Sequence, residues 1–274
     1  MLTKYNQNLH MHGILCDGRD EYEATVQRAL ALGFDGIGFS GHSWMPYSPR
    51  GGMTVENTEK YKAEITRLKE KYRGQIDVYC GIELDMFSPV DVSGFDYVIG
   101  SVHYFDMDGG YVGFDRNAET VKKVIDEHFG GDGMRYAKAY YETLCRLPDI
   151  APIDIVGHFD LITKHAETHD FFDTHSPEYR AWATEALEVL AKRVGIFEIN
   201  TGAIARGYRT TPYPDPYLLS EIHRLGGQIV ISSDCHDNRY LDCGFDDALT
   251  LARSCGFREV LKLTPDGFRA CAIE

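Results

Sequence analysis

Two histidines separated by one residue lie near the start of the chain, in the segment Asn8-Leu9-His10-Met11-His12. Because side chains on a β-strand repeat every second residue, His10 and His12 would project from the same face. Two imidazoles on one face can begin a chelating site for a divalent metal ion, but an isolated pair is as often structural. The pair therefore predicts a metal site only if other ligands accompany it.

Further imidazoles and carboxylates follow apolar runs along the chain. They are His42, Glu83, His103, His158, Asp234 and His236. With His10 and His12, these positions hold six of the eleven histidines, whereas purely structural histidines would be scattered over helices and loops. Mixed imidazole and carboxylate ligands suit Zn, Mn or Fe better than Ca or a thiolate-bound ion. The pattern indicates a transition-metal site.

The elements that must position these residues alternate between apolar runs and amphipathic segments. Strands are expected over residues 5–12, 34–42, 76–84, 95–103, 153–158, 196–201 and 228–234. Helices are expected over 21–32, 54–72, 117–129, 134–147, 176–194, 215–225 and 245–254, followed by a short apolar run over 259–263. Ser176-Pro177 is typical of a helix start, and Gly33 of a helix end.

This alternation predicts an α/β fold with a parallel sheet and right-handed crossovers, either closed into a barrel or open. Polar residues that end strand after strand favour the barrel, where carboxyl ends of the strands meet at one mouth. No repeat and no Pro/Gly/Ser-rich linker divides the sequence. We therefore expect residues 1–274 to form a single domain.

Composition restricts the partners and the compartment. The net charge of −14 argues against a nucleic-acid-binding surface. The first residues have no apolar leader region, and no stretch approaches the ~18 apolar residues of a membrane span. Seven cysteines without a CxxC pair indicate neither a disulfide framework nor a thiolate zinc site. We expect a cytoplasmic protein with a small-molecule substrate, without a nucleic-acid or membrane partner; oligomeric state is not indicated.

These motifs resemble those of the PHP (polymerase and histidinol phosphatase) family, and the whole length resembles its monofunctional histidinol-phosphate phosphatases. The resemblance rests on the HxH pair, on His42, Glu83, His103 and His158, on the closing Asp234-Cys235-His236, and on Asp17 in Cys16-Asp17-Gly18. It implies a distorted (β/α)7 TIM-like barrel with a trinuclear metal site. One departure is Gly41, which stands where many members carry an aspartate that orients the following histidine.

The resemblance also implies how the ligands divide among two to three divalent ions of Zn, Mn or Fe. The first ion would be held by His10, His12, Glu83 and Asp234, the second by Glu83, His103 and His158, and the third by Asp17, His42 and His236. Glu83 would bridge two ions. Asp17 and His236 are candidates for the general acid, as is a water on the third ion.

Charge indicates what such a site would accept. Three divalent ions, three ligand carboxylates and a bridging hydroxide leave about +2, which matches a phosphomonoester dianion better than a neutral amide. Phosphate-monoester hydrolysis needs an acceleration of up to roughly 10²¹, a demand that a multi-metal clamp suits. The resemblance implies hydrolysis of L-histidinol phosphate, in histidine biosynthesis, through a metal-bridging hydroxide.

Three other functions remain open. A PHP phosphoesterase of broader specificity would act on sugar phosphates, nucleotides or a phosphodiester. A metal amidohydrolase would share the barrel and the HxH pair, but no carbamylatable lysine at a strand end is evident. A non-catalytic metal-binding module would keep the site without turnover.

Two basic residues are candidates for binding the substrate's phosphoryl group. Arg206 follows the sixth expected strand and Lys164 follows the segment after His158. An arginine at the mouth could form two charge-assisted hydrogen bonds with phosphate, although a solvated loop residue would look the same in sequence. His165, His169 and His175 lie in a polar connection and are interpreted as part of a loop outside the metal site.

Overall fold

Seven strands form one sheet in which each neighbouring pair is parallel. The computed structural model describes residues 4–48 and 51–273. The order β1-β2-β3-β4-β7-β8-β9 follows the sequence. The strands are β1 (Gln7–Asn8), β2 (Gly36–Phe39), β3 (Asp77–Asp85), β4 (Tyr97–Ser101), β7 (Ile155–Val156), β8 (Ile196–Asn200) and β9 (Gln228–Ser232). All seven lie within or overlap the expected strands, although β1 and β7 are only two residues long.

The sheet closes where the chain leaves its first and last strands. The main-chain N–H of His12 donates to the carbonyl of Cys235 at 2.9 Å, and the N–H of Cys235 donates to the carbonyl of His10 at 3.1 Å. This parallel bridge joins the continuation of β1 to that of β9. The expected barrel is therefore confirmed. Where it closes, the segment with His10 and His12 lies beside the segment with Asp234 and His236.

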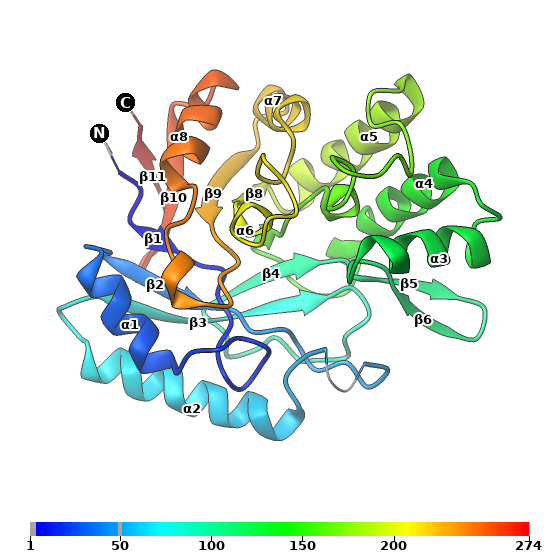
Figure 1. The fold of residues 1–274 in the computed structure, drawn as a ribbon. Coiled ribbons are helices and arrows are strands. Elements are labelled where there is room, and N and C mark those ends of the chain that lie inside the picture. The colour runs from blue at the N-terminus through cyan, green and yellow to red at the C-terminus, as the bar shows by residue number, and fades with distance from the viewer. Residues whose placement is uncertain (1–3, 49–50, 274) are drawn as a thin grey trace.

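Helices surround the strands (Figure 1). They are α1 (Tyr22–Ala31), α2 (Val55–Lys71), α3 (Ala118–His128), α4 (Gly133–Leu144), α5 (Pro177–Arg193), α7 (Pro216–Arg224) and α8 (Phe245–Ser254), with the one-turn α6 (Gly202–Ala205) after β8. Ser176 caps α5 by accepting from the N–H of Tyr179 at 3.2 Å, with Pro177 in the first turn, as the sequence predicts. The short α6 was not expected.

A hairpin of β10 (Glu259–Thr264) and β11 (Gly267–Ala272) fills the amino-terminal end of the barrel. Leu261 and Leu263 of β10 pack with inward-facing residues of the sheet, among them Leu9, Tyr79 and Tyr97. This arrangement brings both ends of the chain to the same side of the molecule (Figure 1). Because the hairpin occupies this end, the opposite end is left for the polar strand termini.

A second antiparallel hairpin, β5 (Tyr104–Met107) with β6 (Gly110–Gly113), follows β4 and projects beside α3 (Figure 1). The sequence pattern predicts no strands there. Its turn contains Gly109 at φ +99°, in the left-handed region where glycine is favoured. The hairpin matters for the site because its return strand leads directly into Asp115.

Short 3₁₀ turns add to these elements at Leu147–Asp149, Leu161–Thr163 and Asn238–Tyr240. The first replaces the end of the helix expected over 134–147, because α4 stops at Leu144. Within the described ranges, no helix combines the length and the apolar character that crossing a bilayer requires.

Candidate metal centre

The predicted ligands converge at the carboxyl-terminal end of the barrel, around the carboxylate of Glu83. Glu83 lies near the end of β3 and is 1% exposed. Its Oε2 lies 2.7 Å from His42 Nδ1 and 3.3 Å from His10 Nε2. Its Oε1 lies 2.9 Å from His158 Nε2 and 3.4 Å from His103 Nε2. One carboxylate thus contacts imidazoles from four strand ends.

Three groups of side chains each bring three or more possible metal-binding atoms within 4.8 Å of one another. They are His10 with His12 and Asp234; His42 with Glu83 and His103; and His12 with Asp17, His42 and His236. The resemblance implies a slightly different division, with Glu83 in the first set and His158 in the second. In the structure His158 joins no group but remains in contact with Glu83, whereas His12 and His42 each belong to two groups.

Exposure increases from the first group to the third. The side chains of His10 and His12 are fully buried and that of Asp234 is 10% exposed. In the third group, His236 is 26% exposed and Asp17 is 43% exposed. A ligand that enters from solvent would therefore meet Asp17 and His236 first.

Buried polar atoms at the centre lack hydrogen bonds. His10 Nε2, His12 Nε2 and Glu83 Oε2 are buried and make no hydrogen bond of acceptable geometry, even where a neighbouring nitrogen is as close as 2.7 Å. Unsatisfied buried polar atoms are rare because each costs about 1–3 kcal/mol. The lone pairs of these nitrogen and oxygen atoms converge without a hydrogen-bond donor, and a cation bound between them would satisfy them. The residues present therefore fit divalent metal ions.

The charges of the site compensate one another. Burial opposes ionisation of Glu83, but the imidazoles of His42 and His10 hold the pKa of its carboxyl well below the usual range. Burial and the neighbouring imidazoles of His236 and His42 lower the pKa of His12. Burial lowers the pKa of His10 and of His42, but neighbouring carboxylates, Glu83 among them, raise it further. A metal ion would therefore displace a proton from each of these two rings, because it binds the ionised carboxylate and the neutral imidazole.

Asp234 occupies a strained backbone position that directs its two oxygens differently. Its φ of +46° lies in the left-handed region, which Asp tolerates better than most residues. Oδ1 faces His12 Nε2 at 3.3 Å, whereas Oδ2 accepts from Arg206 Nη2 at 2.9 Å. Arg206 Nη1 also donates to the Asp234 carbonyl at 2.9 Å. Strain at a ligand position is typical of functional sites.

Arg206 therefore lies beside the site, where it is bonded to the candidate ligand Asp234. It follows α6, and its side chain is 31% exposed. Gly202 makes this approach possible, because a Cβ there would lie 2.9 Å from both Arg206 Nη2 and Asp234 Cβ. Whether Arg206 also binds phosphate, as the sequence predicts, stays a prediction.

Glu198 is a buried residue of β8 that the sequence reading missed. Its Oε1 lies 2.6 Å from His10 Nδ1, and its Oε2 accepts from the main-chain N–H of His158 at 2.8 Å and from Asn200 Nδ2 at 2.9 Å. A carboxylate on the far nitrogen of a histidine fixes the ring's orientation and leaves the other nitrogen for metal. The sequence feature that could have identified Glu198 is a single glutamate within an otherwise largely apolar strand.

Asp85 serves His103 in a similar way. It lies two residues after Glu83 on β3, and its Oδ2 is 3.3 Å from His103 Nδ1. Tyr47 donates to Asp85 Oδ1 at 2.6 Å. The spacing of two in Glu83-Leu84-Asp85 places both carboxylates on one strand face, a signal of the same kind as the HxH pair.

A pocket opens onto the three groups from solvent. Six residues of the metal groups line it, namely Asp17, His42, Glu83, His103, Asp234 and His236. The remaining lining residues are Leu161, Tyr208, His158, Asp115 and both predicted phosphate-binding residues, Lys164 and Arg206. Lys164 Nζ donates to the carbonyl of Asp115 at 2.6 Å and lies 4.8 Å above the Tyr208 ring. The two cations therefore border the same cavity as the candidate ligands.

The loop histidines lie apart from these groups. None of His165, His169 and His175 belongs to a metal-binding group among the described residues. His165 is buried against Tyr208, and His169 stacks on Phe171 at 5.3 Å. Their interpretation as loop residues outside the site agrees with this placement.

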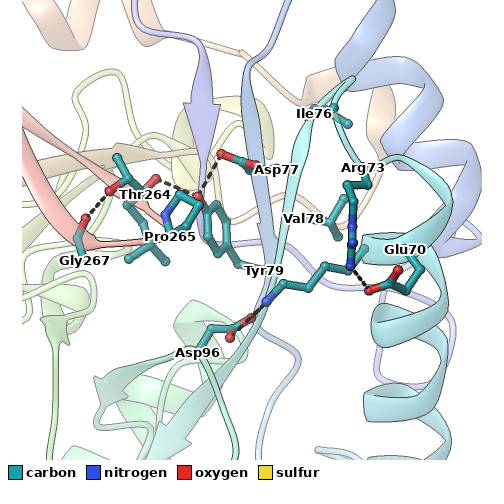
Figure 2. A pocket seen from close by; sticks show the side chains of 13 residues that line it. Glu70, Arg73, Ile76, Asp77, Val78, Tyr79, Asp96, Thr264, Pro265 and Gly267 are labelled. Carbon is teal, nitrogen blue, oxygen red and sulfur yellow. Dashed lines mark hydrogen bonds and ion pairs between the residues drawn. The ribbon is translucent and has the colours of Figure 1, made fainter.

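Another pocket lies at the opposite end of the barrel, where β3 begins and the β10–β11 turn approaches (Figure 2). Its charged side chains are paired with one another. Lys69 contacts Asp96 at 3.2 Å, and Tyr79 donates to Asp77 at 3.2 Å, while Arg73 pairs with Glu70. No group of metal-binding atoms among the described residues lies there, so the candidate chemistry belongs to the other end.

Comparison with known proteins agrees with this geometry. The sequence model of the PHP domain matches residues 8–202. A "probable histidinol-phosphatase" of Deinococcus radiodurans is 30% identical over 266 residues, which cover 92% of this chain and 94% of that protein. The histidinol-phosphatase of Bacillus subtilis is 24% identical over 248 residues, covering 83% of this chain and 92% of the relative.

Solved structures share the fold. The histidinol phosphate phosphatase of Lactococcus lactis, crystallised with zinc, L-histidinol and phosphate, superposes with a TM-score of 0.70 at 20% identity. The superposition covers 96% of this chain and 98% of that one. The barrel is therefore common to both proteins over nearly their whole length.

Proposed function

The chain belongs to the PHP domain family, and we propose that it is a metal-dependent phosphomonoesterase that hydrolyses L-histidinol phosphate to L-histidinol and phosphate. The observation that carries the proposal is the convergence of three histidine–carboxylate groups on buried atoms that lack hydrogen-bond partners. Full-length relatives described as histidinol-phosphatases support the substrate. The reaction would serve histidine biosynthesis in the cytoplasm.

The proposal assigns each candidate ligand a place. His10, His12 and Asp234 would hold one ion, Glu83 with His103, His158 and His42 a second, and Asp17 with His42 and His236 a third. Zn, Mn and Fe all suit this ligand set, and zinc is the ion in the Lactococcus lactis structure. When bound, the ions supply an activated water and neutralise charge on the phosphoryl group.

The chain's own residues would orient the substrate. The exposed side of the pocket, with Asp17 and His236, is the side from which a phosphate ester can enter. Arg206 and Lys164 border the cavity, so their cations can bind phosphoryl oxygens turned away from the ions. Asp17 and His236 are the candidates for returning a proton to the leaving alkoxide.

The proposal extends to the whole chain as one unit of the PHP type. The matched domain region ends at residue 202, yet Asp234 and His236 lie in the same groups as His10 and His12. A catalytic site that needs residues from both parts supports a single domain over 1–274.

A phosphate-release panel tests the function. L-histidinol phosphate, p-nitrophenyl phosphate, a phosphate diester and an amide are compared with the metal-loaded protein, with Glu83→Gln as the control for contaminating phosphatases. We expect the highest kcat/KM for L-histidinol phosphate. Equal kcat/KM values for the two monoesters would favour a phosphoesterase of broad specificity. A preference for the diester or the amide would contradict the proposal. No turnover of any substrate would indicate a non-catalytic metal-binding module.

A further inference from the structure

Four carboxylates line the candidate pocket, and one of them has no place in the metal centre. Asp17, Glu83 and Asp234 each belong to a group of metal-binding atoms, whereas Asp115 belongs to none. A carboxylate that is not neutralised by a metal ion would repel the phosphoryl group of a substrate in the same pocket. Asp115 therefore requires positive partners: Lys164 is one, and a cationic group of the substrate would be a second.

Asp115 is held in a fixed position by its neighbours. It follows β6 by two residues, directly after Phe114, which is 1% exposed and packs against the rings of Phe105 and Tyr136. The main-chain N–H of Phe114 donates to the carbonyl of His103 at 3.2 Å, which ties this segment to a candidate ligand. The main chain that carries Asp115 is thus anchored at the wall of the pocket.

Lys164 leaves most of that carboxylate free. Its ammonium group is 2.6 Å from the main-chain carbonyl of Asp115 but 3.5 Å from carboxylate Oδ2. Within the described part of the chain, no other side chain donates a hydrogen bond to this carboxylate. Burial raises the pKa of Asp115, whereas the nearby Lys164 ammonium and His103 lower it.

We propose that Asp115 binds the ammonium group of an amino-alcohol phosphate, while Lys164 and Arg206 face its phosphoryl group from the same pocket. This inference rests on the proposed function and deepens it. In L-histidinol phosphate the amine stands on the carbon next to the CH₂–O–P unit, so ammonium and phosphate lie close together. A wall that offers a carboxylate beside two cations is complementary to that pair of charges, and it discriminates against phosphate esters without an amine.

The test compares two substrates that differ only in the amine. They are L-histidinol phosphate and 3-(imidazol-4-yl)propyl phosphate, measured with wild type, Asp115→Asn and the control Asp106→Asn. Asp106 is an exposed aspartate on the same hairpin and does not line the pocket. We expect wild type to prefer the amine substrate about 10- to 100-fold, the range for a hydrogen bond to a charged group.

Asp115→Asn should remove that preference by lowering kcat/KM about 10- to 100-fold for L-histidinol phosphate alone, with less than about a threefold change for the analogue. Asp106→Asn should change neither value. An equal loss on both substrates would overturn the inference, since Asp115 would then act through Lys164. Unchanged values for both would overturn it as well.

Wild type alone provides a second measurement that does not depend on the folding of a variant. If the wild-type protein hydrolyses both substrates with equal kcat/KM, the amine is not recognised and the inference is wrong, although the proposed function stands. If it hydrolyses neither substrate while hydrolysing other phosphate esters, the proposed function itself fails.

Discussion

At the amino-terminal end of the barrel, buried polar groups are paired. Gln7 Nε2 donates to the carbonyl of Leu263 at 2.8 Å, and Gln7 Oε1 accepts from the N–H of the same residue at 2.7 Å. At the carboxyl-terminal end, His10 Nε2, His12 Nε2 and Glu83 Oε2 are as deeply buried but lack hydrogen bonds. The first end is complete as protein alone, whereas the second requires another component.

This difference separates stability from function within one sheet. Polar groups that satisfy one another contribute to folding and leave no capacity for a ligand. Polar groups that converge without pairing cost free energy until a ligand completes them, and such sites persist where function requires them. Changes at the carboxyl-terminal end should therefore alter metal binding and activity, whereas changes at the other end should alter stability.

The largest effect is expected from Glu83→Gln. A neutral amide cannot bridge two cations, so metal content should fall and kcat/KM should fall at least about 10³-fold, because a metal ion contributes several kcal/mol to the transition state. The matched change Asp96→Asn, at a paired carboxylate of the other pocket, should leave kcat/KM within about threefold. Near-full activity of Glu83→Gln would contradict the division of the barrel into a carboxyl-terminal end that serves activity and an amino-terminal end that serves stability.

Arg206→Ala should have the next largest effect. The substitution removes the guanidinium group that donates to Asp234 Oδ2, and with it one positive charge from the pocket wall. The fall in kcat/KM should correspond to a loss of about 2–4 kcal/mol of transition-state stabilisation, which is typical of one preorganised electrostatic contact. Arg206→Lys should recover part of that loss, since lysine supplies charge without the fork. Steady-state kinetics of both variants with L-histidinol phosphate measure this, and a silent Arg206→Ala would leave Lys164 as the better phosphate contact.

Glu198→Gln should give a smaller loss that excess metal can reverse. The amide keeps the shape but loses the charge that orients His10, so metal affinity should fall about 10- to 100-fold. Titration of metal into chelator-treated protein measures the affinity, and the thermal unfolding temperature controls for folding. An unchanged affinity would show that Glu198 serves the core and not the metal centre.

Gln7→Ala should affect activity least and stability most. It leaves the N–H of Leu263 without its partner inside the barrel, so the free energy of unfolding should fall by about 1–3 kcal/mol. Denaturant unfolding of the metal-free protein measures this loss, and kcat/KM at 25 °C should stay within about twofold. A variant of normal stability and reduced activity would contradict the division between the two ends.

Much of this organisation could be predicted from the sequence because ligands and strand ends coincide. His42, Glu83, His103 and His158 follow apolar runs, and in a parallel barrel such positions meet at one mouth. The carboxylates that orient the ligands were missed. Glu198 and Asp85 lie within strands, where an apolar pattern draws attention away from a single charged residue, and only the fold reveals that they face inward.

The hairpin of β5 and β6 and the segment after it were missed for another reason. The adjacent glycines Gly109 and Gly110 are typical of a turn, and the strands on either side are only four residues long, so no strand was predicted there. The contact of Lys164 with Asp115 joins residues 49 positions apart, and such pairing depends on the path of the hairpin, which sequence spacing does not encode. Asp115 could therefore be recognised only in the structure.

Elemental analysis of the folded protein, purified without chelator, shows whether metal ions complete the carboxyl-terminal end of the barrel. We expect about two to three transition-metal equivalents per chain. This number should fall in Glu83→Gln and stay unchanged when His165, His169 and His175 are all replaced by Ala. Fewer than about one equivalent in a folded, active protein that takes up no added metal would contradict the claim that metal ions complete the unpaired atoms at the carboxyl-terminal end of the barrel.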